Sequence, residues 1–203
     1  MRICFFGDSF VNGAGDDECL GWPGRVIAAT RQAGRDATCY NLGIRRDTSE
    51  DIAGRWRDEA RCRLPPGCDP RLAFSFGSND CASDEHGSPR VPFARTMANA
   101  ERILNEAKAT APTLMIGPPP IFDDADADAR IRVLSDALDR LCRRIGVPFL
   151  DALTFIDGCA AWKEEAASGD GKHPNRLGYA ALAGHILAWP PCRAWLGIGD
   201  DAT

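Results

Sequence analysis

Short apolar runs alternate with amphipathic stretches along almost the whole of this 203-residue chain. The runs have the length and apolar character of strands that are buried on both faces, and they cover residues 3–6, 38–42, 72–76, 113–116 and 147–150. Parallel strands need a crossover connection, which is usually a helix. The alternation therefore predicts an α/β fold with a central parallel sheet of about five strands and helices on both faces.

Helical patterns fill the segments between these runs. They cover residues 22–33, 48–62, 91–110, 128–145 and 175–189. Thr48 and Asp51 have the spacing of a capping box at the start of the second helix. Because the chain has no linker, internal repeat or low-complexity tract, we expect a single domain over residues 1–203.

The charge and the cysteines narrow the class of protein. The formal charge is −5 and there is no basic stripe, which argues against a nucleic-acid partner. The apolar stretch at residues 3–6 is too short for a signal peptide, and no segment approaches the ~18 apolar residues of a membrane span. Nine cysteines without a secretion signal indicate reduced thiols. We expect a cytoplasmic protein with no membrane insertion, and the oligomeric state stays open.

A serine follows the first predicted strand directly, in the sequence Gly7-Asp8-Ser9. In an open parallel sheet, ligands bind beyond the carboxyl ends of the strands. A serine at that edge is accessible enough to act as a nucleophile, and backbone amides nearby can hold an oxyanion. The same three residue types are common in turns, so a turn explains this segment almost equally well when it is taken alone.

Two more turns end predicted strands and offer hydrogen-bond donors. Gly43 ends the second strand, where a residue without a side chain leaves its backbone N–H open to a ligand. Asn79 follows the third strand, and its side-chain amide can donate to a developing negative oxygen. Taken singly, each residue is explained by the end of a strand or by a turn.

A fourth loop carries a histidine with a carboxylate three residues before it. Asp170 can curl back and orient the imidazole of His173, which leaves the other ring nitrogen to act as a base. Acyl transfer requires a nucleophile, a base with an orienting acid, and oxyanion donors. Ser9, Gly43, Asn79, Asp170 and His173 supply all of these groups at one edge of the predicted sheet.

These segments resemble the four sequence blocks of the SGNH/GDSL hydrolase family. The chain has GDSF at residues 7–10, Gly43 within NLGIRRDTS, GSND at 77–80 and DGKHPN at 170–175. Phe10 stands where the name of the family has leucine, a departure that concerns packing behind the nucleophile. The resemblance extends from Gly7 to His173 and implies a flavodoxin-like three-layer α/β/α sandwich.

The resemblance also implies the roles of single residues. Ser9 is the nucleophile, His173 is the base and Asp170 orients it. The oxyanion hole comprises the backbone N–H groups of Ser9 and Gly43 and the side-chain amide of Asn79. No metal and no organic cofactor is needed.

We therefore expect a carboxylic ester hydrolase, an esterase or acylhydrolase, that cleaves a small-molecule ester through an acyl-enzyme. The same site also suits a carbohydrate O-deacetylase, a thioesterase or a lysophospholipase. A catalytically silent binding domain on the same scaffold is disfavoured, because such proteins usually lack the serine or the histidine and this chain has both. The natural ester and its chain length stay open, since one scaffold serves many esters.

Several polar residues near these blocks allow two interpretations. Arg45 and Arg46 follow Gly43, and they either attract an acidic group of the substrate or pair with Asp47 or Glu50. His86 either lines the pocket or lies in a solvated loop, which its polar neighbours favour.

Three further features are interpreted from their position in the chain. The acidic stretch at residues 123–128 lacks the spacing of a Ca²⁺ loop and is expected to begin a helix, where aspartate is favourable. Trp22 and the prolines at 118–120 are expected to shape the substrate pocket, and His185 is expected to be structural.

Overall fold

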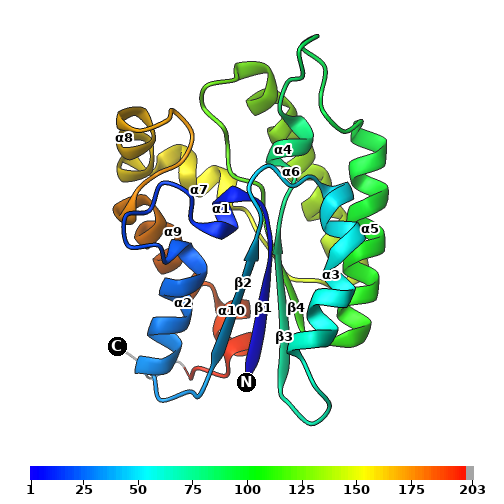
Figure 1. The fold of residues 1–203 in the computed structure, drawn as a ribbon, viewed down its shortest axis with the longest axis vertical. Helices are drawn as coiled ribbons and strands as arrows, with labels where there is room; N and C mark the ends of the chain where they lie inside the picture. The colour runs from blue at the N-terminus through cyan, green and yellow to red at the C-terminus, as the bar shows by residue number, and fades with distance from the viewer. Residues whose placement is uncertain (200–203) are drawn as a thin grey trace.

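Five parallel strands form one sheet in the order β2-β1-β3-β4-β5 in the computed structural model, which describes residues 1–199 (Figure 1). The strands are β1 (Arg2–Gly7), β2 (Thr38–Gly43), β3 (Pro70–Ser75), β4 (Thr113–Ile116) and β5 (Phe149–Leu150). This is the strand order of flavodoxin-like doubly wound sheets, in which the chain changes direction beside the first strand. The predicted fold class is confirmed.

Helices connect the strands and extend beyond the last one. They are α1 (Ser9–Asn12), α2 (Gly21–Gln32), α3 (Ser49–Arg63), α4 (Ser78–Cys81), α5 (Phe93–Thr110), α6 (Ala125–Ile145), α7 (Ala152–Gly158), α8 (Ala160–Ser168), α9 (Arg176–Ala188) and α10 (Pro190–Leu196). None of the helices within residues 1–199 has the length and apolarity that crossing a bilayer requires.

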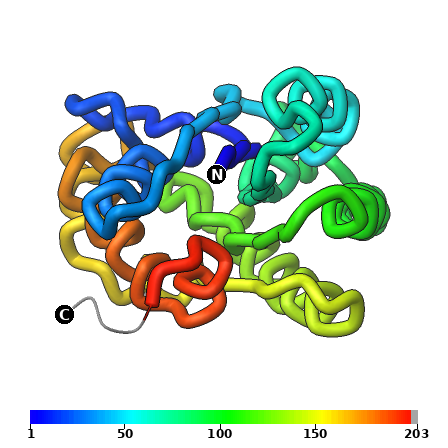
Figure 2. Tube along the Cα trace, turned by 90° about the horizontal axis from the view of Figure 1, so that it is seen from below, coloured from blue at the N-terminus to red at the C-terminus, as the bar shows by residue number. Residues whose placement is uncertain are grey.

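The helices form one layer on each face of the sheet. Figure 2 shows α2, α9 and α10 on one side and α3, α5 and α6 on the other. Strand β1 is buried on both faces, so its alternating side chains enter both layers. Phe5 packs edge-on against Trp22, with ring centroids 5.4 Å apart. Phe6 faces the other way and stacks on Phe74 at 5.3 Å.

The ends of the helices explain most differences from the predicted boundaries. The capping box at Thr48 and Asp51 is present, as predicted. Helix α6 begins at Ala125, three residues before the predicted start, because the carboxylate of Asp124 accepts from the backbone N–H of Ala127. Strand β5 has two residues and not the predicted four, because Pro148 has no N–H to donate to the ladder.

Five short helices within residues 1–199 were not predicted. Helices α1 and α4 have four residues each, which is too short for a helical period to show in the sequence. Helices α7, α8 and α10 have seven to nine residues each and follow the last strand, where the sequence pattern predicted a helix only over residues 175–189. All five are anchored by tertiary contacts, which local sequence does not reveal.

All nine cysteines are free thiols, as the sequence analysis expected. Burial raises the pKa of several of them, to about 12 at Cys4, Cys142 and Cys192 and to about 11 at Cys39. These thiols are uncharged at neutral pH and are therefore poor nucleophiles.

Candidate active site

The turn after β1 presents Ser9 as the first residue of α1. The buried carboxylate of Asp8 caps this helix, and its Oδ1 accepts from the backbone N–H of Phe10 at 2.9 Å. Gly7 lets the end of β1 lie close to the end of β3, because a Cβ at position 7 would lie 2.2 Å from the carbonyl oxygen of Ser75. The turn therefore holds the serine at the carboxyl end of a central strand, as predicted.

His173 connects Ser9 to Asp170 through two short hydrogen bonds. Its Nε2 lies 2.7 Å from the Oγ of Ser9, and its Nδ1 lies 2.7 Å from the Oδ2 of Asp170. Partial burial works to raise the pKa of Asp170, but hydrogen bonds from the backbone and ring of His173 hold it well below its usual range. Asp170 is thus a carboxylate at neutral pH, and it favours the tautomer whose proton lies on Nδ1.

A second carboxylate holds the loop that carries the histidine. Glu165, on α8, accepts from the backbone N–H groups of Asn175 at 2.9 Å, Leu177 at 3.1 Å and Gly178 at 2.8 Å. These donors include the first turn of α9, which lies directly after His173 and Pro174. Glu165 was not singled out in the sequence analysis, because three backbone partners ten or more residues away leave no local signal.

The ring of His173 is confined on two further sides. Phe10 packs against it, with ring centroids 4.9 Å apart, so the residue at the family's leucine position contacts the base directly. Gly15 has φ +88°, and a Cβ there would lie 2.7 Å from the carbonyl oxygen of Pro174. A residue with a side chain at position 15 would push the histidine loop away from the serine.

Gly43 lies against the helix that carries the serine. A Cβ at this position would lie 2.2 Å from the backbone nitrogen of Asn12, which explains the glycine by packing alone. Its N–H donates to the Oδ1 of Asn41 at 3.1 Å. Oxyanion binding through Gly43 therefore requires this bond to be shared or broken, and the predicted role stays a prediction.

Asn79 lies on α4, beyond the end of β3, and lines the same cavity as Ser9. Its side-chain Nδ2 donates to the carbonyl oxygen of Asp47 at 3.0 Å and to the Oδ2 of Asp8 at 3.4 Å. These bonds orient the amide that the sequence analysis assigned to the oxyanion hole. Asp8 is 1% exposed, and burial, with smaller contributions from nearby Asp80 and Asp47, raises its pKa to about 7.

A cavity of about 440 Å³ opens beside the serine. Its lining residues are Ser9, Phe10, Arg45, Arg46, Ser78, Asn79, Ala82, Ser83, Arg90, Ile121, Asp123, Asp170, Lys172 and His173. The walls are mostly polar, and Ser9, His173, Asp170 and Asn79 all line this one space. Arg90 and the ion pair of Lys172 with Asp123, at 3.1 Å, were not anticipated from the sequence.

Arg45 and Arg46 line the cavity and do not form the ion pairs that the sequence analysis weighed. Asp47 instead pairs with Arg55 at 2.7 Å, and Glu50 pairs with Arg95 at 2.9 Å. Arg55 also donates to the carbonyl oxygens of Gly7 and Leu42 at the ends of β1 and β2. These two carbonyl oxygens lie 48 and 13 residues away in the sequence, so the sequence alone does not point to Arg55.

Other sequence expectations had mixed outcomes. Trp22 does not shape the cavity, because it is 2% exposed and packs on Phe5 in the core. The prolines at 118–120 are also buried and do not line it. His86 is solvent-exposed, in the solvated loop that its neighbours favoured. His185 stacks on Phe155 at 4.1 Å, consistent with a structural role.

The acidic stretch before α6 is engaged in local structure. Asp124 caps the helix and also accepts from the backbone N–H of Ser83 at 3.0 Å. Asp128 accepts from the N–H groups of Ile121 at 2.7 Å and Phe122 at 3.0 Å. The start of a helix was predicted here, and these bonds account for it.

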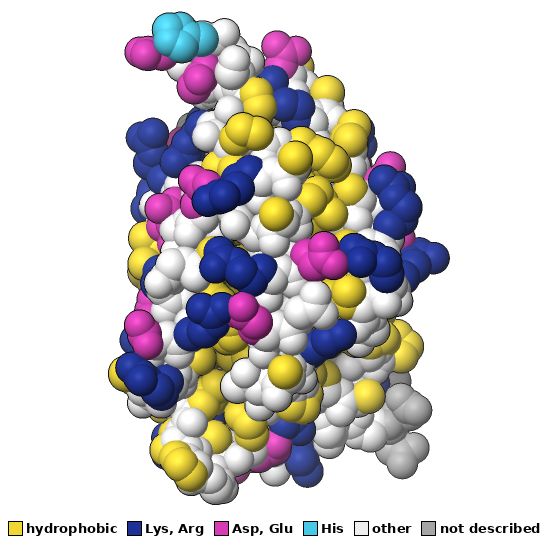
Figure 3. All heavy atoms as spheres, turned by 90° about the vertical axis from the view of Figure 1, so that its right-hand side faces the viewer, with side chains coloured by type: hydrophobic (Ala, Val, Ile, Leu, Met, Phe, Trp, Pro, Cys, Tyr) yellow, Lys and Arg dark blue, Asp and Glu magenta, His cyan; other side chains and the backbone are white. Residues whose placement is uncertain are grey.

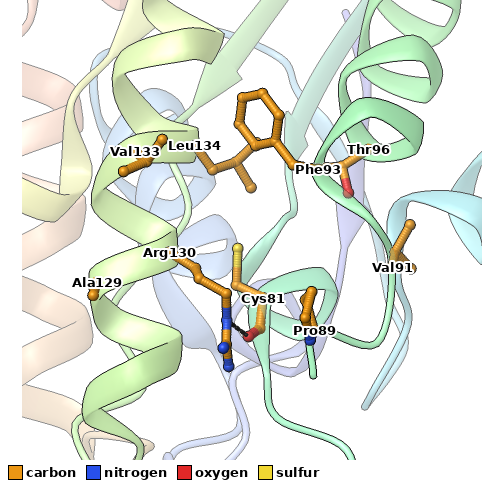
Figure 4. Close-up of a pocket in the computed structure, with 9 residues that line it drawn as sticks. All are labelled: Cys81, Pro89, Val91, Phe93, Thr96, Ala129, Arg130, Val133 and Leu134. Atoms are coloured by element: carbon orange, nitrogen blue, oxygen red, sulfur yellow. Dashed lines mark hydrogen bonds between the residues drawn. The ribbon is translucent and has the colours of Figure 1, made fainter. Parts of the chain in front are cut away.

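A second cavity, of about 380 Å³, lies between α5 and α6 and is mainly apolar (Figure 4). Hydrophobic side chains gather in the upper part of the face that Figure 3 shows. Cys81 contributes the thiol in the lining of this cavity, and burial raises the pKa of that thiol to about 12. Arg130 donates to the carbonyl oxygen of Cys81 at 2.8 Å. This cavity holds no counterpart of the Ser9 and His173 pair.

Comparisons with known proteins match the chain to a family model and to solved structures. A model of the GDSL-like lipase/acylhydrolase family matches residues 5–181. No curated protein sequence matches the chain. Solved structures do match over nearly the whole chain, at identities that show the fold alone.

One of these structures is a lipase/acylhydrolase from Enterococcus faecalis, with 23% identity and a TM-score of 0.74 over 97% of this chain and 95% of that one. Another is an acetylxylan esterase from Geobacillus stearothermophilus, with 16% identity and a TM-score of 0.74 over 98% of this chain and 94% of that one. A third is a hydrolase from the Lake Arreo metagenome, with 21% identity and a TM-score of 0.69 over 97% and 95%.

Proposed function

Because this chain belongs to the GDSL-like lipase/acylhydrolase family, we propose that it hydrolyses small carboxylic esters with Ser9 as nucleophile. The observation that carries the proposal is the continuous hydrogen-bonded series from Ser9 through His173 to Asp170, with both distances at 2.7 Å. The three side chains line one cavity, so a substrate can reach the serine. A nucleophile, its base and the group that orients the base are the arrangement that acyl transfer needs.

In the first half of the reaction, the Oγ of Ser9 attacks the ester carbonyl while Nε2 of His173 accepts its proton. The carboxylate of Asp170 stabilises the imidazolium that forms, and it stays ionised because its pKa is well below the usual range. The backbone N–H of Ser9 is free of an intrahelical acceptor, as the first N–H of α1. This N–H and the amide of Asn79 stabilise the oxyanion, joined by Gly43 once its bond to Asn41 opens.

In the second half, His173 gives its proton to the leaving alcohol, and the bond from the carbonyl carbon to the alcohol oxygen breaks. Water then attacks the acyl-enzyme, with His173 again accepting a proton. The second tetrahedral intermediate releases Ser9 and the carboxylic acid. Each oxyanion donor of this type contributes about 10²–10³ in rate where it has been measured.

The cavity favours short, polar esters over long-chain acyl groups. In this cavity of about 440 Å³, the apolar lining is limited to Phe10, Ala82 and Ile121. A long acyl chain gains affinity from apolar wall, which this space offers sparsely. A small acyl ester, or an acetyl group on a polar alcohol such as a sugar, fits the lining better.

The proposal is tested by screening p-nitrophenyl esters of increasing chain length, acetylated sugars and acyl-CoA against the wild type and Ser9→Ala. We expect turnover of short acyl esters by the wild type and only background hydrolysis by the variant. Circular dichroism and thermal melting check that the variant stays folded. Cleavage that persists in folded Ser9→Ala, or no cleavage of any ester by the wild type, would contradict the proposal.

A further inference from the structure

Arginines without an acidic partner line the cavity beside the candidate nucleophile. We propose that the ester substrate of this chain carries a carboxylate or phosphate group, which Arg45, Arg46 and Arg90 bind. This inference rests on the proposed ester hydrolysis and names the class of ester. The anionic group can belong to either the acyl half or the alcohol half.

The charge of the cavity runs against the charge of the chain. The whole chain carries a formal charge of −5. The cavity, in contrast, is lined by four cationic side chains and two carboxylates. One carboxylate, Asp123, pairs with Lys172 at 3.1 Å, and the other, Asp170, is bound to His173. With histidine counted as neutral, as in the total for the chain, the lining therefore carries a formal excess of two positive charges, which raises the local concentration of anionic ligands.

The acidic residues closest in sequence to Arg45 and Arg46 are bound elsewhere. Asp47 lies 2.7 Å from the Nε of Arg55, and Glu50 lies 2.9 Å from the Nε of Arg95. Within residues 1–199, no ion pair joins Arg45, Arg46 or Arg90 to a carboxylate. An ordinary surface role in pairing with neighbouring acids therefore does not account for these arginines.

The carboxylate of Asp51 is also engaged with the backbone. It accepts from the N–H of Thr48 at 2.9 Å and from the Thr48 hydroxyl at 2.7 Å. This bonding is the capping box of α3, and it leaves the carboxylate tied to the start of the helix. Asp51 thus moderates the charge near Arg90 without forming an ion pair with it.

Two of the arginines are held next to each other by the backbone. The Nη1 of Arg90 donates to the carbonyl oxygen of Arg46 at 3.1 Å, which joins two loops 44 residues apart. Arg46 has φ +71°, a left-handed conformation that side chains other than glycine rarely adopt. Backbone conformations of this strained kind cluster at sites that bind ligands. The positively charged side chains of neighbouring arginines also repel each other. An anion bound in the cavity offsets the positive charge of these side chains.

Guanidinium groups suit carboxylates and phosphates in particular. The planar fork of N–H donors matches two oxygens of either anion, and the group stays charged at every working pH. All three arginines are exposed at the rim of the cavity, so solvent screens each contact. We therefore expect an effect of about tenfold in kcat/KM from two or three such contacts, and one that salt weakens.

The test uses two pairs of esters of matched size. 4-Acetoxybenzoate and 4-acetoxybenzamide place the charge, or its neutral counterpart, on the leaving group. Mono-4-nitrophenyl adipate and the corresponding 4-nitrophenyl adipamate place it on the acyl half. Each kcat/KM is divided by the rate of spontaneous hydrolysis, which removes differences in intrinsic reactivity between the members of a pair.

The variants separate local charge from total charge. Arg45→Gln with Arg46→Gln, and Arg90→Gln alone, remove positive charge from the cavity. Arg61→Gln with Arg143→Gln is the matched control for the double variant, because it also removes two positive charges. These two side chains lie on α3 and α6 and are 79% and 78% exposed. Assays at about 20 mM and about 300 mM NaCl measure the screening.

We expect the wild type and the control to favour the anionic member of at least one pair by about tenfold at low salt. The cavity variants should bring that ratio close to one. Equal rates for both members of both pairs, with cleavage that depends on Ser9, would overturn the inference and leave the proposed function intact. A preference that survives in the cavity variants would overturn it too. If neither member of either pair is cleaved, the proposed function fails and the inference fails with it.

Discussion

Asp8→Asn tests how far burial raises the pKa of Asp8, the residue before the candidate nucleophile. Asp8 is 1% exposed, and burial raises the pKa of its carboxyl group from 3.8 to about 7. In the unfolded chain the carboxyl group regains its ordinary pKa. Between about pH 4 and pH 7 the folded protein therefore holds a proton at Asp8 that the unfolded chain releases. The contribution of Asp8 to stability consequently falls as the pH rises through this window.

The size of the effect follows from the shift. Each pH unit inside the window changes the free energy of unfolding by about 1.4 kcal/mol, so the whole window amounts to about 4 kcal/mol. Asparagine keeps an oxygen that can accept from the N–H of Phe10, as Oδ1 of Asp8 does at 2.9 Å. It remains a good helix cap and does not titrate. Other ionisable groups, including Asp80 and Asp47, are present in both proteins and largely cancel in the comparison.

Urea unfolding of the wild type and Asp8→Asn at pH 5, 6, 7 and 8 measures this difference. We expect the stability of the wild type relative to the variant to fall by about 2–3 kcal/mol from pH 5 to pH 7, and to level off above the folded pKa. If the free energy of unfolding changed equally with pH in the wild type and in Asp8→Asn, the assigned protonation of Asp8 would be refuted.

Two further substitutions test the packing around the site. Gly43→Ala places a Cβ 2.2 Å from the backbone nitrogen of Asn12. We therefore expect the free energy of unfolding to fall by about 2–3 kcal/mol, which lowers Tm by roughly 5–10 °C. The control Gly54→Ala lies in α3, where the added Cβ meets open space, and should not lower Tm. An unchanged Tm for Gly43→Ala would contradict the close approach of α1 to β2. Glu165→Gln weakens the three hydrogen bonds from backbone N–H groups that hold the loop after His173. We therefore expect kcat to fall several-fold, with a smaller change in KM. Glu164→Gln, at the exposed neighbouring residue, serves as the control. Equal kcat for the two glutamate variants would argue against a positioning role for Glu165.

The parts of the fold that could be predicted share a physical cause. Strand β1 is recognisable because burial on both faces requires a continuous apolar run, and α3 because its capping box is local. The proximity of Ser9, Asn79 and His173 followed from the rule that ligands bind at the carboxyl ends of parallel strands. The structure brings these residues together, while their catalytic roles remain predictions.

The parts that could not be predicted depend on contacts between distant segments. Glu165 reaches the start of α9, and Arg90 reaches the carbonyl of Arg46, without any local pattern in the sequence. Trp22 was assigned to the pocket from its place after the first strand, but α2 turns its indole inward onto Phe5. The direction in which a side chain points depends on how the helix packs, which sequence position alone does not determine.

The central claim is that Ser9 is a nucleophile activated by His173, and covalent labelling tests it most directly. A fluorophosphonate probe is incubated with the wild type, Ser9→Ala and His173→Gln, and the adducts are followed by intact mass and located by peptide mapping. We predict one adduct per wild-type chain, located on Ser9, none on Ser9→Ala, and labelling of His173→Gln slowed by about 10² or more. An unlabelled but folded wild type, or an adduct on any residue other than Ser9, would contradict the account.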